Sequence, residues 1–407
     1  MNINMKKWLG CAALGAAGLL MTTAAQAENI KIGVMLPFSG VNADLGDVQI
    51  KAIDLYMKLH GKDIAPHTVE LIKREEGPPS GANAKTVATE LITRDKVNLI
   101  LGVIFSPSAI AMAPVMTQAK VPFVMTNAGT AWITKLSPYI TRFSFSMWHP
   151  AYAMGQYAAK DLKCKTAAMG YTDFPPGKDS TDAFKTAFEK NGGKITDSIP
   201  MGNPAQVPDM APFFQRVKDA KPDCFYVFIP SGNHASAVVK TYGELGLKQA
   251  GIKLIGPMDV APDSKLQPMG DAAVGVIVTS SYANSLDNKV NKEFVKAWHE
   301  AYGKDNYPDF MSAAAWDAMH ATFQTIKKLN GKFTGDQFVK EISHWSGEGP
   351  RGKVSIDPAT RDIVQDEYVL EVVKTADGKL DLKQIGKVPQ VKDQCKELKI
   401  GRCGDAK

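Results

Sequence analysis

The chain has 407 residues, of which 44% are hydrophobic and 22% charged, and its formal net charge is +6. This composition is typical of a folded globular protein and excludes both a disordered chain and a membrane-embedded bundle. No run of lysine and arginine with interleaved aromatic residues occurs, so we expect no nucleic acid among its partners.

The first 27 residues have the pattern of a cleaved secretory signal peptide. Lys6 and Lys7 precede an apolar stretch from Trp8 to Met21, and Ala25-Gln26-Ala27 supplies the small residues of a cleavage site. The apolar stretch is shorter than the ~20 residues that a membrane-spanning helix needs, which makes a retained anchor the weaker alternative. We therefore expect cleavage after Ala27, export to an oxidising compartment, and no membrane insertion of the mature chain.

Strands and helices alternate along the first part of the mature chain. The apolar run Ile30–Leu36 predicts a strand buried on both faces of a parallel sheet. The elements predicted after it are a helix at 47–59, a strand at 69–73, a helix at 81–94, a strand at 97–104, a helix at 107–119, a strand at 121–126 and a short helix after Thr130. This spacing is typical of βαβ units in a doubly wound parallel sheet.

The same alternation begins again after Pro150. The predicted elements are helices at 151–162, 180–191, 212–219 and 235–245, with strands at 166–171, 194–199, 225–229, 254–256 and 275–280. Helices at 292–302, 313–329 and 335–342 follow, then strand-like pieces at 352–356 and 366–373 and a lysine-rich tail. The pattern predicts two α/β lobes, with crossings near 147–150, 280–285 and 349–356. Lobe one is expected to contain 28–148 and 283–350, and lobe two 149–282 and 351–407.

Cysteine and histidine give no sign of a metal site. The four cysteines that remain after cleavage, Cys164, Cys224, Cys395 and Cys403, allow three full disulfide pairings, between which the sequence does not choose. No CxxC pair occurs and the seven histidines lack the spacing of metal ligands, so we expect neither metal nor cofactor.

Nothing in the sequence indicates catalysis. The stretch GEGPRG at 347–352 matches GxGxxG by letter, but Pro350 interrupts it and no apolar strand leads into it, so we expect a turn. No GxxxxGK[ST], HExxH or GxSxG motif is present. Asp173 and Lys178 are the best reactive pair that can be assembled, and such a pair is more often a solvated ion pair. We therefore expect a binding protein rather than an enzyme.

Two loops that follow neighbouring predicted strands have the chemistry of an anion site. In Phe105-Ser106-Pro107-Ser108, Ser106 suits an N-cap and Pro107 the first helical position, which leaves free amides at the helix start. In the segment 127–130, Asn127, Ala128 and Gly129 permit close backbone approach, and Thr130 adds a hydroxyl. Together the two loops predict a cradle for a carboxylate. The alternative is that the serines only cap a helix.

The chain resembles the periplasmic solute-binding proteins of ABC importers, in the leucine/isoleucine/valine-binding family. The resemblance covers nearly the whole mature chain and rests on the order and spacing of IKIGVMLPFSG, LILGVIFSPSAIAMAPVMTQAKVPFVMTNAGT, YTDFPPGKDSTDAFKTAFEKNGGKI, PDCFYVFIPSG and IGPMD. It implies a type I periplasmic fold: two Rossmann-like doubly wound lobes joined by three crossover segments, with a ligand cleft between them. It also implies a periplasmic location and a membrane permease as partner. In amino-acid-binding members, hydroxyls and amides of lobe one hold the carboxylate, and these positions fall on Ser108, Ala128 and Thr130.

The departures from the family pattern indicate the ligand. The acidic residue that binds the ammonium in amino-acid binders falls on Met258, with Asp259 beside it, and the covering aromatic residues fall near Leu45, Pro176 and Pro230. A buried ammonium without a counter-ion costs several kcal/mol, so we expect a carboxylate on an apolar body, such as an aromatic or hydrophobic acid. A branched-chain or other amino acid, for which Asp259 could serve, is the alternative, and a sensor that presents its ligand to a membrane receptor is another.

The candidate site residues are therefore drawn from both lobes. They are Leu45, Phe105, Ser106, Ser108, Asn127, Ala128, Gly129, Thr130, Tyr171, Phe174, Pro176, Pro230, Ser231, Met258 and Asp259, with Phe105, Tyr171, Phe174 and Met258 expected as walls.

Overall fold

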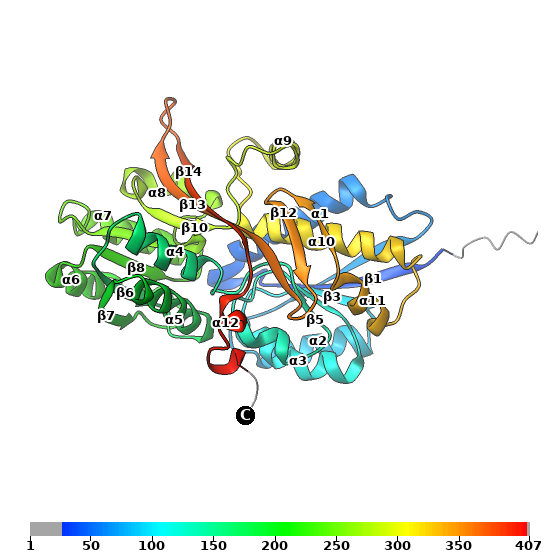
Figure 1. The fold of residues 1–407 in the computed structure, drawn as a ribbon. Helices are drawn as coiled ribbons and strands as arrows, with labels where there is room; N and C mark the ends of the chain where they lie inside the picture. Colours follow the sequence, from blue (N-terminus) through cyan, green and yellow to red (C-terminus); the bar gives the residue numbers. More distant parts are fainter. Residues whose placement is uncertain (1–26, 405–407) are drawn as a thin grey trace, which may run out of the picture.

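The computed structural model describes residues 27–404, which form two lobes side by side (Figure 1). The predicted signal peptide falls, except for Ala27, outside the described residues. Within residues 27–404, no helix has the length and apolar character needed to cross a bilayer.

Lobe one is built on a five-stranded sheet in which every neighbouring pair of strands is parallel, in the order β2-β1-β3-β4-β5. Its strands are β1 (Asn29–Leu36), β2 (Thr68–Glu75), β3 (Leu99–Gly102), β4 (Phe123–Met125) and β5 (Ile140–Arg142). Its first helices are α1 (Ala43–His60), α2 (Ala82–Thr93) and α3 (Ser106–Ala119), followed by the 3-10 turn η2 (Ala131–Lys135). Val34 packs into the core on one face of the sheet, and Met35 packs into the core on the other. This explains why the predicted first strand is apolar except for Lys31.

Lobe two carries a second, mixed sheet. Its parallel strands are β6 (Thr166–Tyr171), β7 (Lys194–Pro200), β8 (Cys224–Phe228), β9 (Lys253–Pro257) and β10 (Ile277–Ser280), in the order β10-β9-β8-β6-β7. Its helices are α4 (Pro150–Lys160), α5 (Pro175–Lys190), α6 (Ala211–Ala220), α7 (Asn233–Glu244) and α8 (Asp263–Met269), with the 3-10 turn η3 (Met258–Val260) after β9. The doubly wound α/β prediction is confirmed for both lobes.

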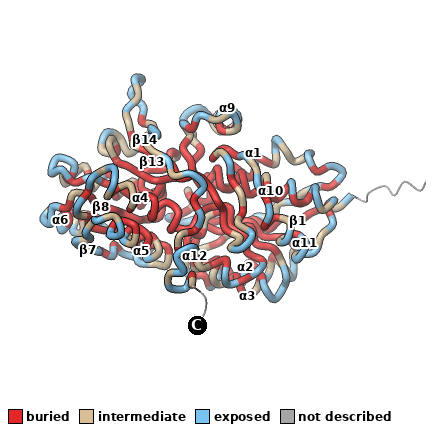
Figure 2. The backbone as a smooth tube through the Cα atoms, in the orientation of Figure 1, coloured by how far each residue is buried: buried red, intermediate tan, exposed pale blue. Residues whose placement is uncertain are grey.

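Three later helices return to lobe one: α9 (Lys289–Tyr302), α10 (Phe310–Lys328) and α11 (Gly335–Ile342). The α10 helix packs along α1, where the Ser312 hydroxyl donates to the carbonyl oxygen of Val48 at 3.2 Å. Asp309 caps α10 by accepting from the amides of Met311 and Ser312. Figure 2 shows that buried residues gather in the interior of both lobes, in strands such as β8, whereas exposed residues lie on outer helices such as α6 and α9.

The third crossing between the lobes lies later than predicted. The final strands are β11 (Ser346–Gly349), β12 (Gly352–Asp357), β13 (Asp362–Lys374) and β14 (Leu380–Val391). The start of β13, up to Val364, pairs with β12 beside lobe one, whereas Tyr368–Glu371 pairs with β10 of lobe two. The chain therefore crosses inside β13, not at 349–356, because one long antiparallel strand serves both lobes. The GEGPRG stretch contains the end of β11, the hairpin turn and the first residue of β12, and part of the predicted lysine-rich tail forms β14.

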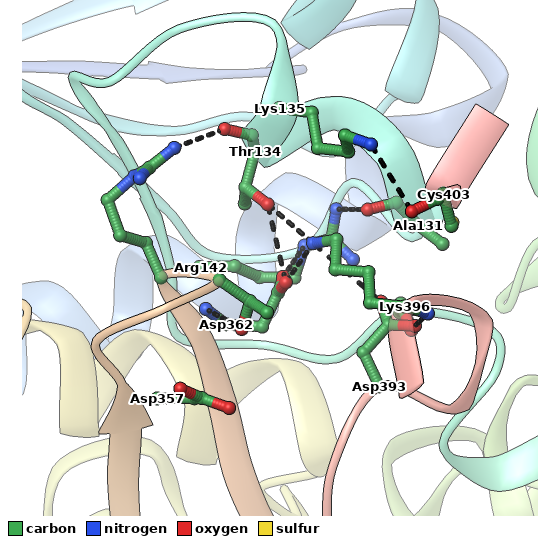
Figure 3. A network of polar contacts seen from close by, with 12 residues as sticks. Ala131, Thr134, Lys135, Arg142, Asp357, Asp362, Asp393, Lys396 and Cys403 are labelled. Carbon is green, nitrogen blue, oxygen red and sulfur yellow. Dashed lines mark hydrogen bonds and ion pairs between the residues drawn. The ribbon is translucent and has the colours of Figure 1, made fainter. Parts of the chain in front are cut away.

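The assignment of all of 351–407 to lobe two is corrected by the C-terminal segment, which contains α12 (Gln394–Glu397) and η5 (Gly401–Cys403). This segment packs against η2 of lobe one (Figure 3). The Lys396 ammonium forms an ion pair with the buried Asp362 and donates to the Thr134 hydroxyl at 2.5 Å. Lys135 donates to the carbonyl oxygen of Cys403 at 3.2 Å. A buried carboxylate needs a cationic partner, and the tail supplies it.

The cysteines adopt one of the three pairings left open by the sequence. Cys164 pairs with Cys224 inside lobe two, and Cys395 pairs with Cys403 in the C-terminal segment. Asp393 lies near the second pair, and this group is the one set of potential metal ligands found among residues 27–404. Because both sulfur atoms are in a disulfide, they are not available as thiolate ligands.

Candidate functional site

The interlobe cavity lies between the two sheets at the carboxyl ends of their strands, and it contains about 390 Å³ of empty space, part of which is open to solvent. Lobe one lines it with Leu45, Ile104, Phe105, Asn127, Gly129, Phe145, Met147 and Met311, and lobe two with Phe174, Pro176, Phe228, Pro230, Ser231 and Asp259. Four phenylalanines and several aliphatic residues surround a few polar groups. This is the usual character of a small-molecule site, in which apolar walls give affinity and polar groups fix orientation.

The structure brings most of the predicted site residues into the lining and leaves others behind it. Leu45, Phe105, Asn127, Gly129, Phe174, Pro176, Pro230, Ser231 and Asp259 line the cavity, whereas Ser106, Ser108, Ala128, Thr130, Tyr171 and Met258 do not. Five further lining residues were not predicted: Ile104, Phe145, Met147, Phe228 and Met311. These residues are apolar and carry no motif. The positions of Ile104 and Phe228 at the carboxyl ends of predicted strands were the available signals.

Ser106 connects the two predicted anion-binding loops through a hydrogen bond. Phe105, not Ser106, is the N-cap of α3, so the predicted capping role of Ser106 is wrong. Its hydroxyl oxygen instead accepts from the amide of Thr130 at 3.1 Å. The loop after β4 is thereby fixed to the start of α3, and the Thr130 amide is not free to bind an anion. The Ala128 amide is also occupied, because it donates to the carbonyl oxygen of Val103 at 3.3 Å.

The hydroxyls of Ser108 and Thr130 have no hydrogen-bond partner among the described residues. Both side chains are fully buried, with 0% of their surface exposed. A buried hydroxyl without a partner costs roughly 1–3 kcal/mol, so such groups are rare in folded proteins unless a ligand or water satisfies them. Both residues belong to the loops that line the cavity through Phe105 and Gly129. These two hydroxyls are therefore candidate donors to a ligand.

Glu76 is a buried carboxyl beneath this site that the sequence analysis missed. It directly follows β2 and accepts from the amides of Ile104 at 2.8 Å and Phe105 at 2.9 Å. Burial raises the pKa of Glu76 to about 8, although these two amides and the nearby Ser108 hydroxyl act to lower it. The Ser108 oxygen itself lies outside hydrogen-bonding geometry. The protein therefore occupies part of the predicted cradle with its own carboxyl.

The raised pKa of Glu76 predicts that stability falls as pH rises. The folded protein holds this proton up to about pH 8, whereas the unfolded chain releases it near its ordinary value of 4.5. The contribution is therefore fully present below pH 4.5 and is lost as pH rises through 8. Chemical denaturation at pH 5 and pH 8 measures this loss in the wild type and in Glu76→Gln. Between these two pH values, the free energy of unfolding of the wild type should fall by up to about 3 kcal/mol more than that of the variant. Equal drops in the two proteins would contradict this assignment.

Asp259 places a carboxyl on the lobe-two wall of the cavity. It lies in η3, and its Oδ1 accepts from the Ser231 hydroxyl at 3.3 Å, while its Oδ2 has no partner among the described residues. Burial raises the pKa of Asp259 to about 7, with the charge of Asp309 adding to the effect and the Ser231 bond opposing it. The predicted wall residue Met258 is instead buried in the core outside the lining, because the 3-10 turn directs it there. The lobe-two wall is therefore not purely apolar.

The two lobes touch across the cleft. Lys265 of lobe two forms an ion pair with Asp44 of lobe one at 2.9 Å. Asp179 of α5 accepts from the amide of Ala131 at 2.7 Å, and Asn233 donates to the carbonyl oxygen of Val41 at 3.2 Å. These contacts join surfaces that would separate if the cleft opened, so the described arrangement is a closed one.

Asp173 and Lys178, the reactive pair considered from the sequence, lie outside the cavity. Lys178 and Asp173 form an ion pair at 3.1 Å, with 63% and 49% of their side chains exposed. Exposed pairs of this kind contribute little and do not activate a nucleophile.

Comparison with known proteins gives one consistent family. A model of the periplasmic binding protein family matches residues 29–379. A Leu/Ile/Val-binding protein homolog 6 from Brucella abortus is 36% identical over 366 residues, which cover 90% of this chain and 93% of that protein.

Two solved structures are similar over nearly their whole length. A solute-binding protein of an ABC transporter from Rhodopseudomonas palustris BisB5, in complex with 3,4-dihydroxybenzoic acid, is 41% identical with a TM-score of 0.85. A second solute-binding protein from R. palustris, in complex with 4-hydroxybenzoate, is 37% identical with a TM-score of 0.85. Each comparison covers 90% of this chain and 98% of the other.

Proposed function

Because the chain belongs to the periplasmic binding protein family of ABC transporters, we propose that it captures an aromatic carboxylic acid in the interlobe cavity and delivers it to a membrane permease. The signal-peptide pattern supports export to the periplasm, with cleavage after Ala27.

The observation that carries this proposal is the lining of the cavity. Phe105 and Phe145 of lobe one and Phe174 and Phe228 of lobe two surround a space that suits a flat ring. The rings of Phe174 and Phe228 are stacked, with centroids 6.0 Å apart and an interplanar angle of 26°. Offset and edge contacts between aromatic rings favour an aromatic guest. The two similar R. palustris proteins hold hydroxybenzoic acids.

The carboxylate of the ligand is assigned to lobe one. There the hydroxyls of Ser108 and Thr130 are buried without partners, and charge-assisted hydrogen bonds from such donors to a carboxylate are strong. In lobe two the group available is the Asp259 carboxyl, which would repel an acid.

Binding is coupled to lobe closure. A ligand that rests first on lobe one adds contacts with Phe174, Phe228 and Asp259 only when lobe two moves over it, so it shifts the population towards the closed form. The ion pair between Lys265 and Asp44 is made in that form. The permease would recognise the closed form, in which both lobes present their outer surfaces together.

Binding of a branched-chain amino acid is the second candidate function. It is favoured by the free Oδ2 of Asp259, which could pair with an α-ammonium, and by the name of the Brucella relative.

Isothermal titration separates the two candidates. The protein is unfolded, dialysed and refolded to remove any bound ligand, and then titrated with benzoate, 4-hydroxybenzoate, leucine and octanoate. We expect at least one aromatic acid to bind with a Kd at least about 100-fold below that of leucine, a difference of roughly 2.7 kcal/mol. Tight leucine binding without a response to either aromatic acid would overturn the proposal.

A further inference from the structure

The polar end of the cavity in lobe two is built from two neighbouring strands. Ser231 follows β8 and Asp259 follows β9, and these strands are hydrogen-bonded neighbours in the sheet. The two residues are 3% and 6% exposed. The Ser231 hydroxyl donates to Oδ1 of Asp259 and so fixes the carboxyl, while Oδ2 remains without a partner.

No cation lines the cavity beside this carboxyl within the described part of the chain. The charged group that acts on Asp259 is Asp309, another carboxyl, which caps α10 and accepts from Ser264 at 2.5 Å. Lys265, close in sequence, is 28% exposed and is paired with Asp44. Asp259 is therefore a lining residue of a space with aromatic walls, and its Oδ2 is a buried acceptor without a partner among the described residues. Leaving such an acceptor unpaired is costly.

We propose that Oδ2 of Asp259 accepts a hydrogen bond from a hydroxyl group on the aromatic ring of the ligand, which makes Asp259 the residue that selects hydroxylated aromatic acids over benzoate. This inference rests on the proposed function and names the substrate class of the same cavity. Ser231 acts through Asp259 as a positioning residue.

The surroundings favour a hydroxyl over an ammonium. An ammonium needs a fully ionised partner, but burial and the Asp309 charge both raise the pKa of Asp259, and an anionic ligand would raise it further. A phenolic hydroxyl needs only an acceptor oxygen, which a carboxyl offers in either protonation state. A phenol also carries no charge into the cavity, so it avoids the cost of burying a cation.

A site built to pair a substrate hydroxyl rejects the analogue that lacks it, because its own polar group is then left unpaired. Titration with benzoate, 3-hydroxybenzoate and 4-hydroxybenzoate should therefore show that one hydroxybenzoate binds roughly 10- to 100-fold more tightly than benzoate. Asp259→Leu should abolish this preference, with benzoate binding kept or improved. Asp259→Asn, which keeps an acceptor oxygen, should retain part of the preference. The matched control is Asp173→Asn, which removes an exposed carboxylate of the same lobe outside the cavity.

Each outcome separates this inference from the proposed function. Equal affinity for benzoate and both hydroxybenzoates in the wild type, or a preference that survives Asp259→Leu, would overturn the role of Asp259 while aromatic acid binding stands. Failure of all three acids to bind would overturn the proposed function itself. Tight leucine binding that Asp259→Asn abolishes would assign the carboxyl to an ammonium and overturn the inference. Near-ultraviolet circular dichroism of each variant confirms that the tertiary packing is intact.

Discussion

Replacing Ser108 with alanine is expected to weaken binding of 4-hydroxybenzoate by roughly 5- to 150-fold, the equivalent of about 1–3 kcal/mol. Thr130→Val should have an effect of the same size, and the double variant a larger one. Both hydroxyls are buried and have no partner among the described residues. A ligand carboxylate that meets them gains two hydrogen bonds to a charged group, and the variants lose these.

The same variants should not destabilise the ligand-free protein. Removing a buried hydroxyl without a partner relieves a desolvation cost, so the free energy of unfolding should stay equal or rise. Titration calorimetry and chemical denaturation on the same samples would therefore show opposite trends in affinity and stability. Thr89→Val on the outer face of α2 is a suitable control, because among residues 27–404 its hydroxyl bonds only to the Lys85 carbonyl oxygen. Unchanged affinity in Ser108→Ala and Thr130→Val would remove the carboxylate from these loops.

Arg351→Met is expected to lower the free energy of unfolding by about 3–5 kcal/mol, because it leaves a buried carboxylate without its partner. Arg351 is 1% exposed and donates to Oδ2 of Asp317 at 2.7 Å. It also donates to the carbonyl oxygens of Phe143 and Ser144 and to Oε1 of Gln365. One side chain thus joins the segment that directly follows β5, α10 and the crossing part of β13.

A second substitution tests the cause of this loss. Arg351→Met combined with Asp317→Leu removes both charges, so a substantial part of the lost stability should return. Guanidinium denaturation of the wild type, the two single variants and the double variant forms a complete cycle. A double variant no more stable than Arg351→Met would show that the contacts of Arg351 with the carbonyl oxygens of Phe143 and Ser144, not the ion pair, dominate its role.

The order of elements was predictable because it depends on local patterns. The apolar run Ile30–Leu36 reads as a strand buried on both faces, and β6 occupies the same residues, 166–171, that were predicted. The short strand β5 and the helix α8 were missed, since Ile140–Arg142 offers too few residues for a period and Pro268 interrupts the pattern of α8. Parallel strands at this spacing also place the ligand loops at one edge of each sheet.

The details of the site depend on contacts between distant segments, which a single sequence does not report. Glu76 and the Ile104 amide lie 28 positions apart, so the carboxyl beneath the cradle had no local signal. Whether Met258 or Asp259 faces the cavity is decided by one 3-10 turn. The C-terminal segment was predicted in the wrong lobe. It lies on lobe one because Lys396 pairs with Asp362, and this contact depends on β13 running between the lobes, which no local pattern indicates.

A crystal structure of the protein with 4-hydroxybenzoate tests the central claim most directly. We predict that the ligand carboxylate lies within about 3.2 Å of the hydroxyl oxygens of Ser108 and Thr130, with the ring between the phenylalanines of the two lobes and the ring hydroxyl at Asp259. A ligand bound in the reverse orientation, or with its carboxylate away from residues 106–108 and 127–130, would contradict the account.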